Sequence, residues 1–229
     1  MASGRIGGRG ARQRVRTARG RKVGSTRWLE RQLNDPHVRE ARRLGYRSRA
    51  AFKLIEIDDR FTLLRPGARV LDLGAAPGGW VQVAVERVRP GKTGGRVVGL
   101  DMAPVEPVAG AILVEGDVMA EDTPARLAAA LGAPADLVLS DMAAATTGHA
   151  VTDHLRTLAL AEAALDIACA LLAPGGAVVL KLLQGAGEAE LFRALGRAFA
   201  TARRVKPKAS RAGSAELYLV ATGFRGASA

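Results

Sequence analysis

The sequence has little of what stabilises secreted or membrane proteins. It contains a single cysteine, Cys169, so no disulfide can form within the chain, which favours a reducing compartment. No apolar run approaches the ~18 residues of a membrane-spanning helix. The first residues also lack the basic and then apolar pattern of a secretory signal. We therefore expect a cytoplasmic protein that does not associate with membranes.

Candidate metal ligands are equally scarce. The three histidines, His37, His149 and His154, do not have the spacing of a metal site. Cys169 lies within an alanine- and leucine-rich helical pattern, which indicates a small core residue rather than a nucleophile or a ligand. We expect no bound metal.

Acidic residues are nearly absent from the start of the chain. Residues 1–50 hold 15 Lys and Arg but only 3 acids, so their net charge of +12 equals that of the whole chain. Residues 1–24 hold eight basic residues, no acids and few large apolar side chains, a composition that cannot fold alone. We expect a disordered basic arm over 1–24 that binds nucleic-acid phosphates. A solvated tail and an organellar transit peptide are the alternatives.

The next segment, residues 25–65, has a helical pattern. Residues 35–45 begin with Asp-Pro and end with glycine, which predicts one short helix. Ser48 predicts the start of a second helix that runs to about Arg60, with Phe52 and Ile55 on its inner side.

Residues 66–229 predict strands that alternate with helices. This order indicates an α/β fold with a seven-stranded, mostly parallel sheet and helices on both faces. The last two strands, joined by a Pro-, Ser- and Gly-containing loop, predict an antiparallel hairpin at the sheet edge. The expected strands are 69–73, 96–101, 111–115, 136–140, 177–182, 203–206 and 215–222, and the expected helices are 79–88, 122–131, 153–172 and 188–200.

A glycine turn follows the first of these strands. Residues 70–80 read as a buried strand, a tight turn and the start of a helix, which is where open α/β sheets bind an adenine-bearing cofactor. Gly74, Ala76 and Gly79 fall on the spacing of the dinucleotide fingerprint. That spacing alone does not separate NAD from S-adenosylmethionine.

Acids and a proline around this turn favour S-adenosylmethionine. Asp101 can accept hydrogen bonds from the ribose hydroxyls of either cofactor. Pro77 removes an N–H donor that a pyrophosphate would need, and Asp117 can accept from an adenine amine. With Asp72, these acids end three successive strands, which suits a ligand with a sulfonium and an ammonium group. A nicotinamide-dependent oxidoreductase remains the alternative.

Charged residues also end the two following strands. Asp141 follows strand 136–140, and Lys181 lies near the end of strand 177–182. A lysine in a buried strand is costly unless it is paired. Desolvation and a neighbouring cation can lower a lysine pKa enough for general-base catalysis. We therefore expect Lys181 as the base, Asp141 as its orienting carboxylate and Lys53 as a second cation.

Six motifs together resemble the RrmJ/FtsJ-type ribosomal RNA 2′-O-ribose methyltransferases, most closely the bacterial branch that acts on 23S rRNA. The resemblance runs from about Ser25 to Gly223. The motifs are Arg-Trp-Leu at 27–29, Tyr-Arg-Ser-Arg-Ala at 46–50 with Phe-Lys-Leu at 52–54, Asp-Leu-Gly-Ala-Ala-Pro-Gly-Gly-Trp at 72–80, Ser-Asp-Met-Ala at 140–143, Leu-Ala-Pro-Gly-Gly at 172–176, and Ser-Arg at 210–211 with Glu-Leu-Tyr at 216–218.

The resemblance implies a Rossmann-like S-adenosylmethionine-dependent methyltransferase fold and a set of site residues. The family's catalytic Lys-Asp-Lys-Glu tetrad falls on Lys53, Asp141, Lys181 and Glu216. The implied cofactor contacts are Gly78, Trp80, Asp101, Asp117 and Asp141, beside Gly74 of the glycine turn. The chain departs from the family at Ala144-Ala145, where Pro-Asn is usual, so the loop on the substrate side differs in sequence.

The implied activity is S-adenosylmethionine-dependent 2′-O-methylation of a uridine in 23S rRNA of the large ribosomal subunit. We expect a monomer with one domain over 25–229, comprising a helical RNA-binding lead-in (25–65) and a catalytic sheet (66–229), and no binding to DNA. Another RNA, such as a tRNA or an mRNA cap, and a non-catalytic role in ribosome assembly are the alternatives. Candidate contacts to the RNA backbone are Arg42, Arg43, Arg47, Arg49, Lys206, Lys208 and Arg211.

Overall fold

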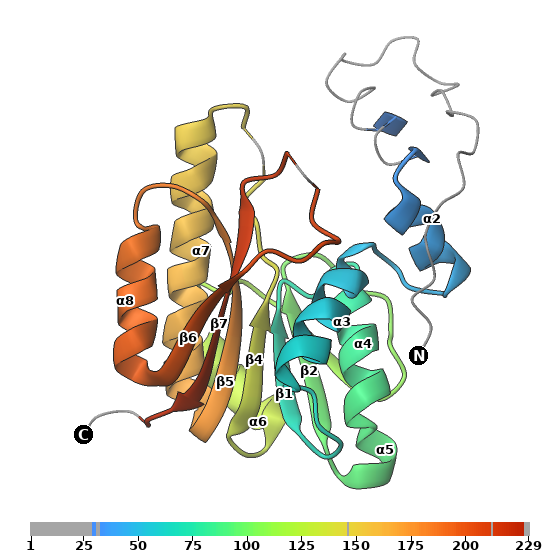
Figure 1. The fold of residues 1–229 in the computed structure, drawn as a ribbon. Coiled ribbons are helices and arrows are strands. Elements are labelled where there is room, and N and C mark those ends of the chain that lie inside the picture. The colour runs from blue at the N-terminus through green and yellow to red at the C-terminus, as the bar shows by residue number, and fades with distance from the viewer. Residues whose placement is uncertain (1–28, 31–32, 146, 212, 227–229) are drawn as a thin grey trace.

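The structure is a computed structural model that describes residues 29–30, 33–145, 147–211 and 213–226 (Figure 1). The basic arm expected over 1–24 lies outside the described residues. Within the described part of the chain, no helix is both long and apolar enough to cross a membrane.

A single sheet of seven strands organises the described chain. Its order is β3-β2-β1-β4-β5-β7-β6, in which β1 to β5 are parallel and β7 runs antiparallel to both β5 and β6. This confirms the α/β prediction and the terminal hairpin. The strands are β1 (Arg69–Leu73), β2 (Arg96–Asp101), β3 (Ala111–Glu115), β4 (Ala135–Ser140), β5 (Leu172–Leu183), β6 (Phe199–Val205) and β7 (Glu216–Phe224).

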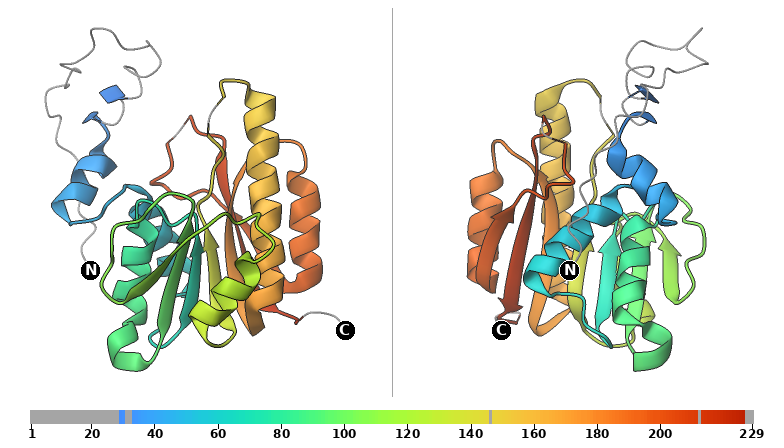
Figure 2. Two further views of the ribbon diagram at one scale, coloured as in Figure 1. Left: turned by 180° about the vertical axis from the view of Figure 1, so that it is seen from behind. Right: turned by 45° about the vertical axis from the view of Figure 1, so that its right-hand side comes forward.

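Helices cover both faces of the sheet (Figures 1 and 2). The helices α6 (Thr123–Leu131), α7 (Ala150–Leu171) and α8 (Glu188–Ala198) pack on one face, around a buried cluster that includes Leu127, Leu165 and Leu195. The helices α3 (Ala50–Phe61) and α4 (Gly79–Val88) pack on the other, around Leu54 and Val81. The short α5 (Pro90–Thr93) follows α4 at the opposite end of the sheet from α2 (Pro36–Arg43).

Four expected elements have the predicted bounds, and the largest differences lie at the starts of α7 (Ala150, expected at 153), β5 and β6 (Phe199, expected at 203). β1, α4, β2 and β3 have the bounds that the sequence predicts. β5, however, begins at Leu172, directly where α7 ends, and not at residue 177. The reason is that Leu172 pairs with Ala135 of β4, with an irregular register before Leu137 pairs with Ala177. The Pro-Gly-Gly of residues 174–176 therefore lies within the strand.

The lead-in helices agree with the sequence at α2 and differ at α3. Asp35 caps α2, accepting a hydrogen bond from the backbone N–H of His37 (3.0 Å). At α3 the N-cap is Arg49, with no side-chain cap, so the prediction of Ser48 as the cap was wrong. The Ser48 hydroxyl lies instead against Gly79 at the start of α4, where a Cβ would come within 2.4 Å of it.

The inner face of α3 also differs from the prediction. Ala51, Leu54 and Ile57 are fully buried, whereas Phe52 and Ile55 are half-buried. The ring of Phe52 packs against those of His37 and Tyr46, with centroids 5.8 and 6.0 Å apart. Phe52 therefore joins α3 to α2.

Buried Asp58 joins the end of α3 to the segment that follows it and to α4. Its Oδ1 accepts hydrogen bonds from the backbone N–H groups of Leu63 and Leu64, both at 2.7 Å. Its Oδ2 pairs with Arg87 of α4. The same carboxylate therefore satisfies two backbone donors and a cation where the chain leaves α3 for β1.

We predict that Asp58→Ala destabilises the protein by about 3 kcal/mol, because it leaves two backbone donors without their acceptor and removes one of the two carboxylates that pair with the half-buried Arg87. Urea unfolding would measure the change. The control is Asp59→Ala, which removes an exposed partner of the same Arg87 and should cost less than about 1 kcal/mol. Equal losses in the two variants would contradict this role of Asp58.

Candidate active site

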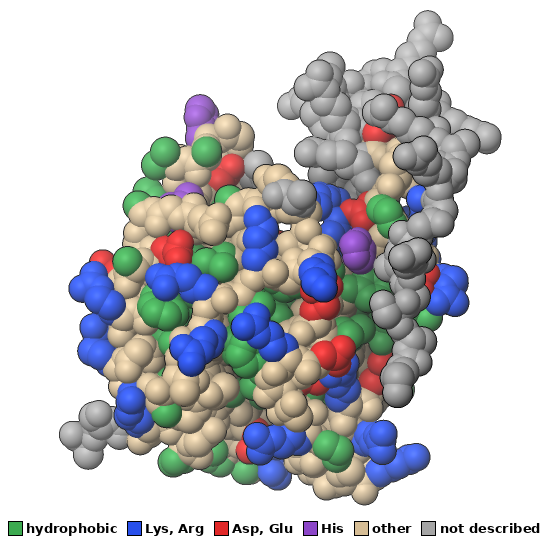
Figure 3. All heavy atoms as spheres, viewed as in Figure 1, with side chains coloured by type: hydrophobic (Ala, Val, Ile, Leu, Met, Phe, Trp, Pro, Cys, Tyr) green, Lys and Arg blue, Asp and Glu red, His purple; other side chains and the backbone are tan. Residues whose placement is uncertain are grey.

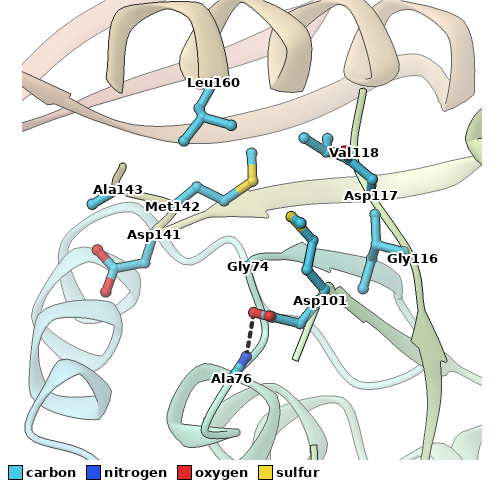
Figure 4. Close-up of a pocket in the computed structure, with 12 residues that line it drawn as sticks. Gly74, Ala76, Asp101, Gly116, Asp117, Val118, Asp141, Met142, Ala143 and Leu160 are labelled. Carbon is cyan, nitrogen blue, oxygen red and sulfur yellow. Dashed lines mark hydrogen bonds between the residues drawn. The ribbon is translucent and has the colours of Figure 1, made fainter. Parts of the chain in front are cut away.

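A cavity of about 340 Å³ lies at the carboxyl ends of the central parallel strands (Figure 4). Leu160 points into it from α7, opposite the loops that follow β1 and β2. This is the position at which open α/β sheets bind ligands. Its lining residues are Gly74, Ala76, Leu100, Asp101, Met102, Gly116, Asp117, Val118, Asp141, Met142, Ala143 and Leu160.

Gly74 is required by the close approach of two loops. Its φ is +80°, and a Cβ there would lie 2.5 Å from Cγ of Met142. The N–H groups of Gly74 and Ala75 both donate to the carbonyl of Leu100, at 2.8 and 3.0 Å. The turn after β1 is thereby held against the end of β2, and the floor of the cavity forms between them.

Three carboxylates line the cavity, and backbone donors orient two of them. Asp101 accepts hydrogen bonds from the N–H groups of Ala76 (2.9 Å) and Ala103 (2.8 Å). Asp117 accepts one from the N–H of Met119 (2.9 Å). With Asp141, these side chains come from the ends of β2, β3 and β4, as the sequence predicted.

The fourth predicted acid, Asp72, lies elsewhere. It is fully buried within β1, and neither carboxyl oxygen has a hydrogen-bond partner among the described residues. Burial raises its pKa well above the usual range, and the charges of Asp141 and Asp101 raise it further. Burial therefore favours the protonated form of Asp72, which lies close to the cavity but is not part of its lining. The surroundings favour a cationic ligand and disfavour a pyrophosphate.

Two of the expected cofactor contacts lie outside this lining. Trp80 is buried, its Nε1 donates to the carbonyl of Ala50 (2.8 Å), and its ring centroid lies 5.8 Å from that of Tyr218. Its side chain joins α4 to α3 and does not line the cavity. Gly78 faces Arg47, since a Cβ there would lie 2.8 Å from Nη1 of that arginine.

Beside the cavity, the structure brings the four residues of the expected tetrad together. Lys181 of β5 lies 3.2 Å from Oδ1 of Asp141 and 3.6 Å from Oε2 of Glu216. Lys53 of α3 lies 2.8 Å from the same Glu216 oxygen and 3.9 Å from Oδ1 of Asp141. Each lysine therefore contacts both carboxylates. At least four-fifths of each of these side chains is buried.

Tyr218 is a fifth member of this cluster. Its hydroxyl donates to Oδ1 of Asp141 (2.5 Å) and accepts from Nζ of Lys53 (3.1 Å). No role was expected for it from the sequence. Its position two residues after Glu216 was the available signal, because alternate residues of a strand share a face. The register then places Tyr218 directly opposite Lys181.

The protonation of Lys181 differs from the sequence expectation. Burial lowers its pKa, but the charges and hydrogen bonds of Asp141 and Glu216 outweigh burial and raise the pKa above the usual value. The pKa of Glu216 is lowered: burial acts to raise it, but Lys53, Lys181 and the Ser210 hydroxyl outweigh that effect. Lys181 is therefore an ammonium group in the resting protein. The prediction that its surroundings depress its pKa was wrong.

Arg47 holds two loops that border the cavity. Its Nη1 donates to the carbonyls of Glu106 (2.6 Å) and Pro77 (3.4 Å), and its Nη2 donates to that of Pro107 (2.8 Å). The guanidinium thus ties the turn after β1 to the loop after β2. Arg47 was expected to contact RNA, and these bonds give it a positioning role on the cofactor side.

Metal-ligating residues do not cluster anywhere in the described ranges. Cys169 is half-buried against the hydrophobic cluster of α6, α7 and α8, and burial raises the pKa of its thiol. Nε2 of His154 lies 2.5 Å from the carbonyl of Ala186, which joins α7 to the loop after β5.

The fold and the site define a class of protein: a Rossmann-like sheet whose cavity, lined by acids, adjoins a buried Lys-Asp-Lys-Glu cluster. The family model described as FtsJ-like methyltransferase matches residues 46–224, and the chain belongs to this family.

Similar curated proteins align with nearly the whole chain. A protein of Paramagnetospirillum magneticum named ribosomal RNA large subunit methyltransferase E is 59% identical over 230 residues, covering 99% of this chain and 94% of its own. One of the same name from Rhodospirillum rubrum is 59% identical over 216 residues, covering 94% and 82%. A crystal structure of a ribosomal RNA methyltransferase from Plasmodium falciparum has a TM-score of 0.71 and 28% identity, covering 80% of this chain and all of that chain.

We predict that Arg47→Ala weakens binding of the methyl donor about tenfold, because two loops at the cavity lose their charged hydrogen-bond donor. Calorimetric titration with S-adenosylhomocysteine would measure it. The matched control is Arg43→Ala, which removes an exposed arginine paired with Glu40 on α2 and should leave the affinity unchanged. Loss of RNA affinity with unchanged cofactor affinity in Arg47→Ala would contradict the positioning role.

Proposed function

We propose that the protein is an S-adenosylmethionine-dependent methyltransferase that modifies the 2′ hydroxyl of a uridine in 23S rRNA of the large ribosomal subunit. The position of Asp141 carries this proposal. Asp141 lines the cavity and its carboxylate pairs with Lys181, so a methyl donor in the cavity would lie close to a buried lysine. The names of the relatives support a ribosomal RNA substrate.

The residues of the cavity fit S-adenosylmethionine. The three acidic residues of its lining suit a ligand with two positive groups, and the volume is within the range of small-molecule sites. Asp101 would hold the ribose of the cofactor, and Asp117 its adenine amine. When bound, S-adenosylmethionine supplies the methyl group and its own leaving group.

In the proposed mechanism, Lys181 first loses the proton of its resting ammonium form to solvent, and the resulting amine accepts the proton of the ribose hydroxyl. A 2′ hydroxyl is a weak nucleophile, so the 2′ oxygen gains the methyl group as its proton passes to Nζ of Lys181. Asp141 and Glu216 orient that nitrogen, and Lys53 and Tyr218 hold the two carboxylates in place. Alignment of the hydroxyl with the methyl group supplies much of the acceleration.

The remaining assignments belong to the same proposal. Residues 25–65 form a helical lead-in for RNA and residues 66–229 a catalytic sheet of one domain, preceded by a basic arm that binds phosphates. The protein acts as a cytoplasmic monomer and binds neither DNA nor membranes. Lys and Arg are spread across the face in Figure 3, interspersed with acids.

We predict that the purified protein transfers label from S-adenosylmethionine to one ribose of large ribosomal subunits from a strain that lacks this gene. Resistance to alkaline cleavage would locate the ribose. Free 23S rRNA and tRNA run alongside identify the substrate. Lys181→Ala should lower the rate about 10³-fold, with S-adenosylhomocysteine still bound, while Lys92→Ala on α5 should match the wild type.

Label on tRNA alone would show that the substrate is tRNA and not 23S rRNA. Cofactor binding without label on any RNA would favour the assembly role. Full activity of Lys181→Ala would overturn the assignment of the base.

We also predict that the single-turnover rate rises about tenfold per pH unit from about pH 7 to pH 9. The pKa of Lys181 is raised, so the ammonium form dominates at neutral pH and the free amine grows tenfold with each unit below the pKa. Rapid-quench measurements with saturating cofactor and RNA would give the slope. A flat profile over this range would show that Lys181 does not lose its proton before transfer.

A further inference from the structure

A second, smaller pocket adjoins the tetrad on the side of the β6–β7 loop. It has a volume of about 140 Å³ and is separate from the cavity assigned to the cofactor. It shares Lys53 and Glu216 with the tetrad, and its other lining residues are Arg49, Arg211 and Ser214. The side chains of Lys53 and Glu216 therefore border both this pocket and the proposed reaction centre.

Two buried donors in this pocket have no acceptor. Nε of Arg49 and Nη2 of Arg211 are buried and have no hydrogen-bond partner in the ranges that the structure describes. Buried polar groups are nearly always paired, and an unpaired one costs about 1–3 kcal/mol. Both residues line the same pocket, which indicates that an acceptor belongs between them.

The protein holds Arg49 in place before any ligand arrives. Its Nη1 pairs with Asp35, and its Nη2 donates to the carbonyl of Ala209. The loop that carries Ala209 is itself fixed, because Glu56 of α3 accepts hydrogen bonds from the N–H groups of Lys208 (2.5 Å) and Ala209 (2.9 Å). A preorganised guanidinium loses little entropy when it binds an anion.

The charged groups around the pocket have a net positive charge that one more anion would neutralise. Arg211 lies 3.5 Å from the same Asp35 oxygen that Arg49 contacts, so two arginines share one carboxylate. The network that joins this pocket to the tetrad contains the cations Arg49, Arg211, Lys53 and Lys181 and the carboxylates Asp35, Asp141 and Glu216. Cations therefore exceed carboxylates by one.

We propose that this pocket binds the phosphodiester group on the 3′ side of the target ribose. The inference rests on the proposed function, because it needs a ribose at Lys181. In RNA the carbon that bears the 2′ hydroxyl is bonded to the carbon that bears the 3′ phosphate. A ribose whose 2′ oxygen lies at Lys181 therefore brings a phosphate to the adjoining pocket. Arginine forks match phosphate oxygens and form strong charge-assisted hydrogen bonds with them.

Arg211→Gln tests this pocket, with Arg65→Gln as a matched control at the opposite end of the sheet. Arg211→Gln should weaken binding of the RNA substrate about tenfold and reduce the slope of log affinity against log salt concentration by about one. Its affinity for S-adenosylhomocysteine should stay at the wild-type value, which shows that the variant is folded. Arg49→Lys, which keeps the charge but loses the fork, should also weaken RNA binding.

Fluorescence anisotropy of a labelled RNA at several salt concentrations gives these affinities. Unchanged RNA affinity and salt slope in Arg211→Gln, or an equal loss in Arg65→Gln, would overturn the proposal. Competition with mononucleotides tests the 3′ position: uridine 3′-monophosphate should inhibit methyl transfer more strongly than uridine 5′-monophosphate, and equal inhibition would refute it. If the wild-type protein methylates no RNA, the proposed function itself fails, whatever the variants do.

Discussion

The mutual neutralisation of two buried lysines and two buried carboxylates is the constraint on which the site depends. Lys53 and Lys181 each contact both Asp141 and Glu216, and removal of any one group would leave an unpaired charge in a largely dry environment. These four residues come from α3, β4, β5 and β7. The cluster therefore forms only when the lead-in helix, the parallel sheet and the final antiparallel strand are all in place, which couples the site to the complete fold.

The reversal of β7 explains why its residues belong to this cluster. In a purely parallel sheet, the residues that begin a strand lie at the end remote from the cavity. Because β7 runs antiparallel to β5, its first residue, Glu216, pairs with Leu183 at the end of β5, and Tyr218 lies opposite Lys181. The antiparallel edge hairpin is thus what supplies a carboxylate and a hydroxyl to the carboxyl ends of the parallel strands.

Sequence reasoning succeeded where the signal was local and failed where partners are distant in the chain. Strand ends, the glycine turn at Gly74 and the acids of the cavity follow from periodicity and turn chemistry, and the structure places them as expected. The bonds of Arg47 to residues 77, 106 and 107 and the burial of Trp80 against α3 depend on tertiary contacts, which composition does not encode. The same holds for Asp72. The sequence predicted its position in the strand, but not that its carboxyl group would have no hydrogen-bond donor nearby among the described residues.

The raised pKa of Lys181 shows that burial and the proposed base catalysis make opposite demands on this residue. Two carboxylates make it possible to bury the ammonium group, and the same carboxylates hold its proton. Full desolvation alone would lower the pKa but would leave the folded state with an unpaired buried lysine. Added positive charge in the adjacent cavity resolves the conflict, because like charge lowers a lysine pKa. Asp141 lines that cavity and pairs with Lys181, so under the proposed function a cationic methyl donor would compete with the lysine for the same carboxylate and raise the share of Lys181 present as the free amine.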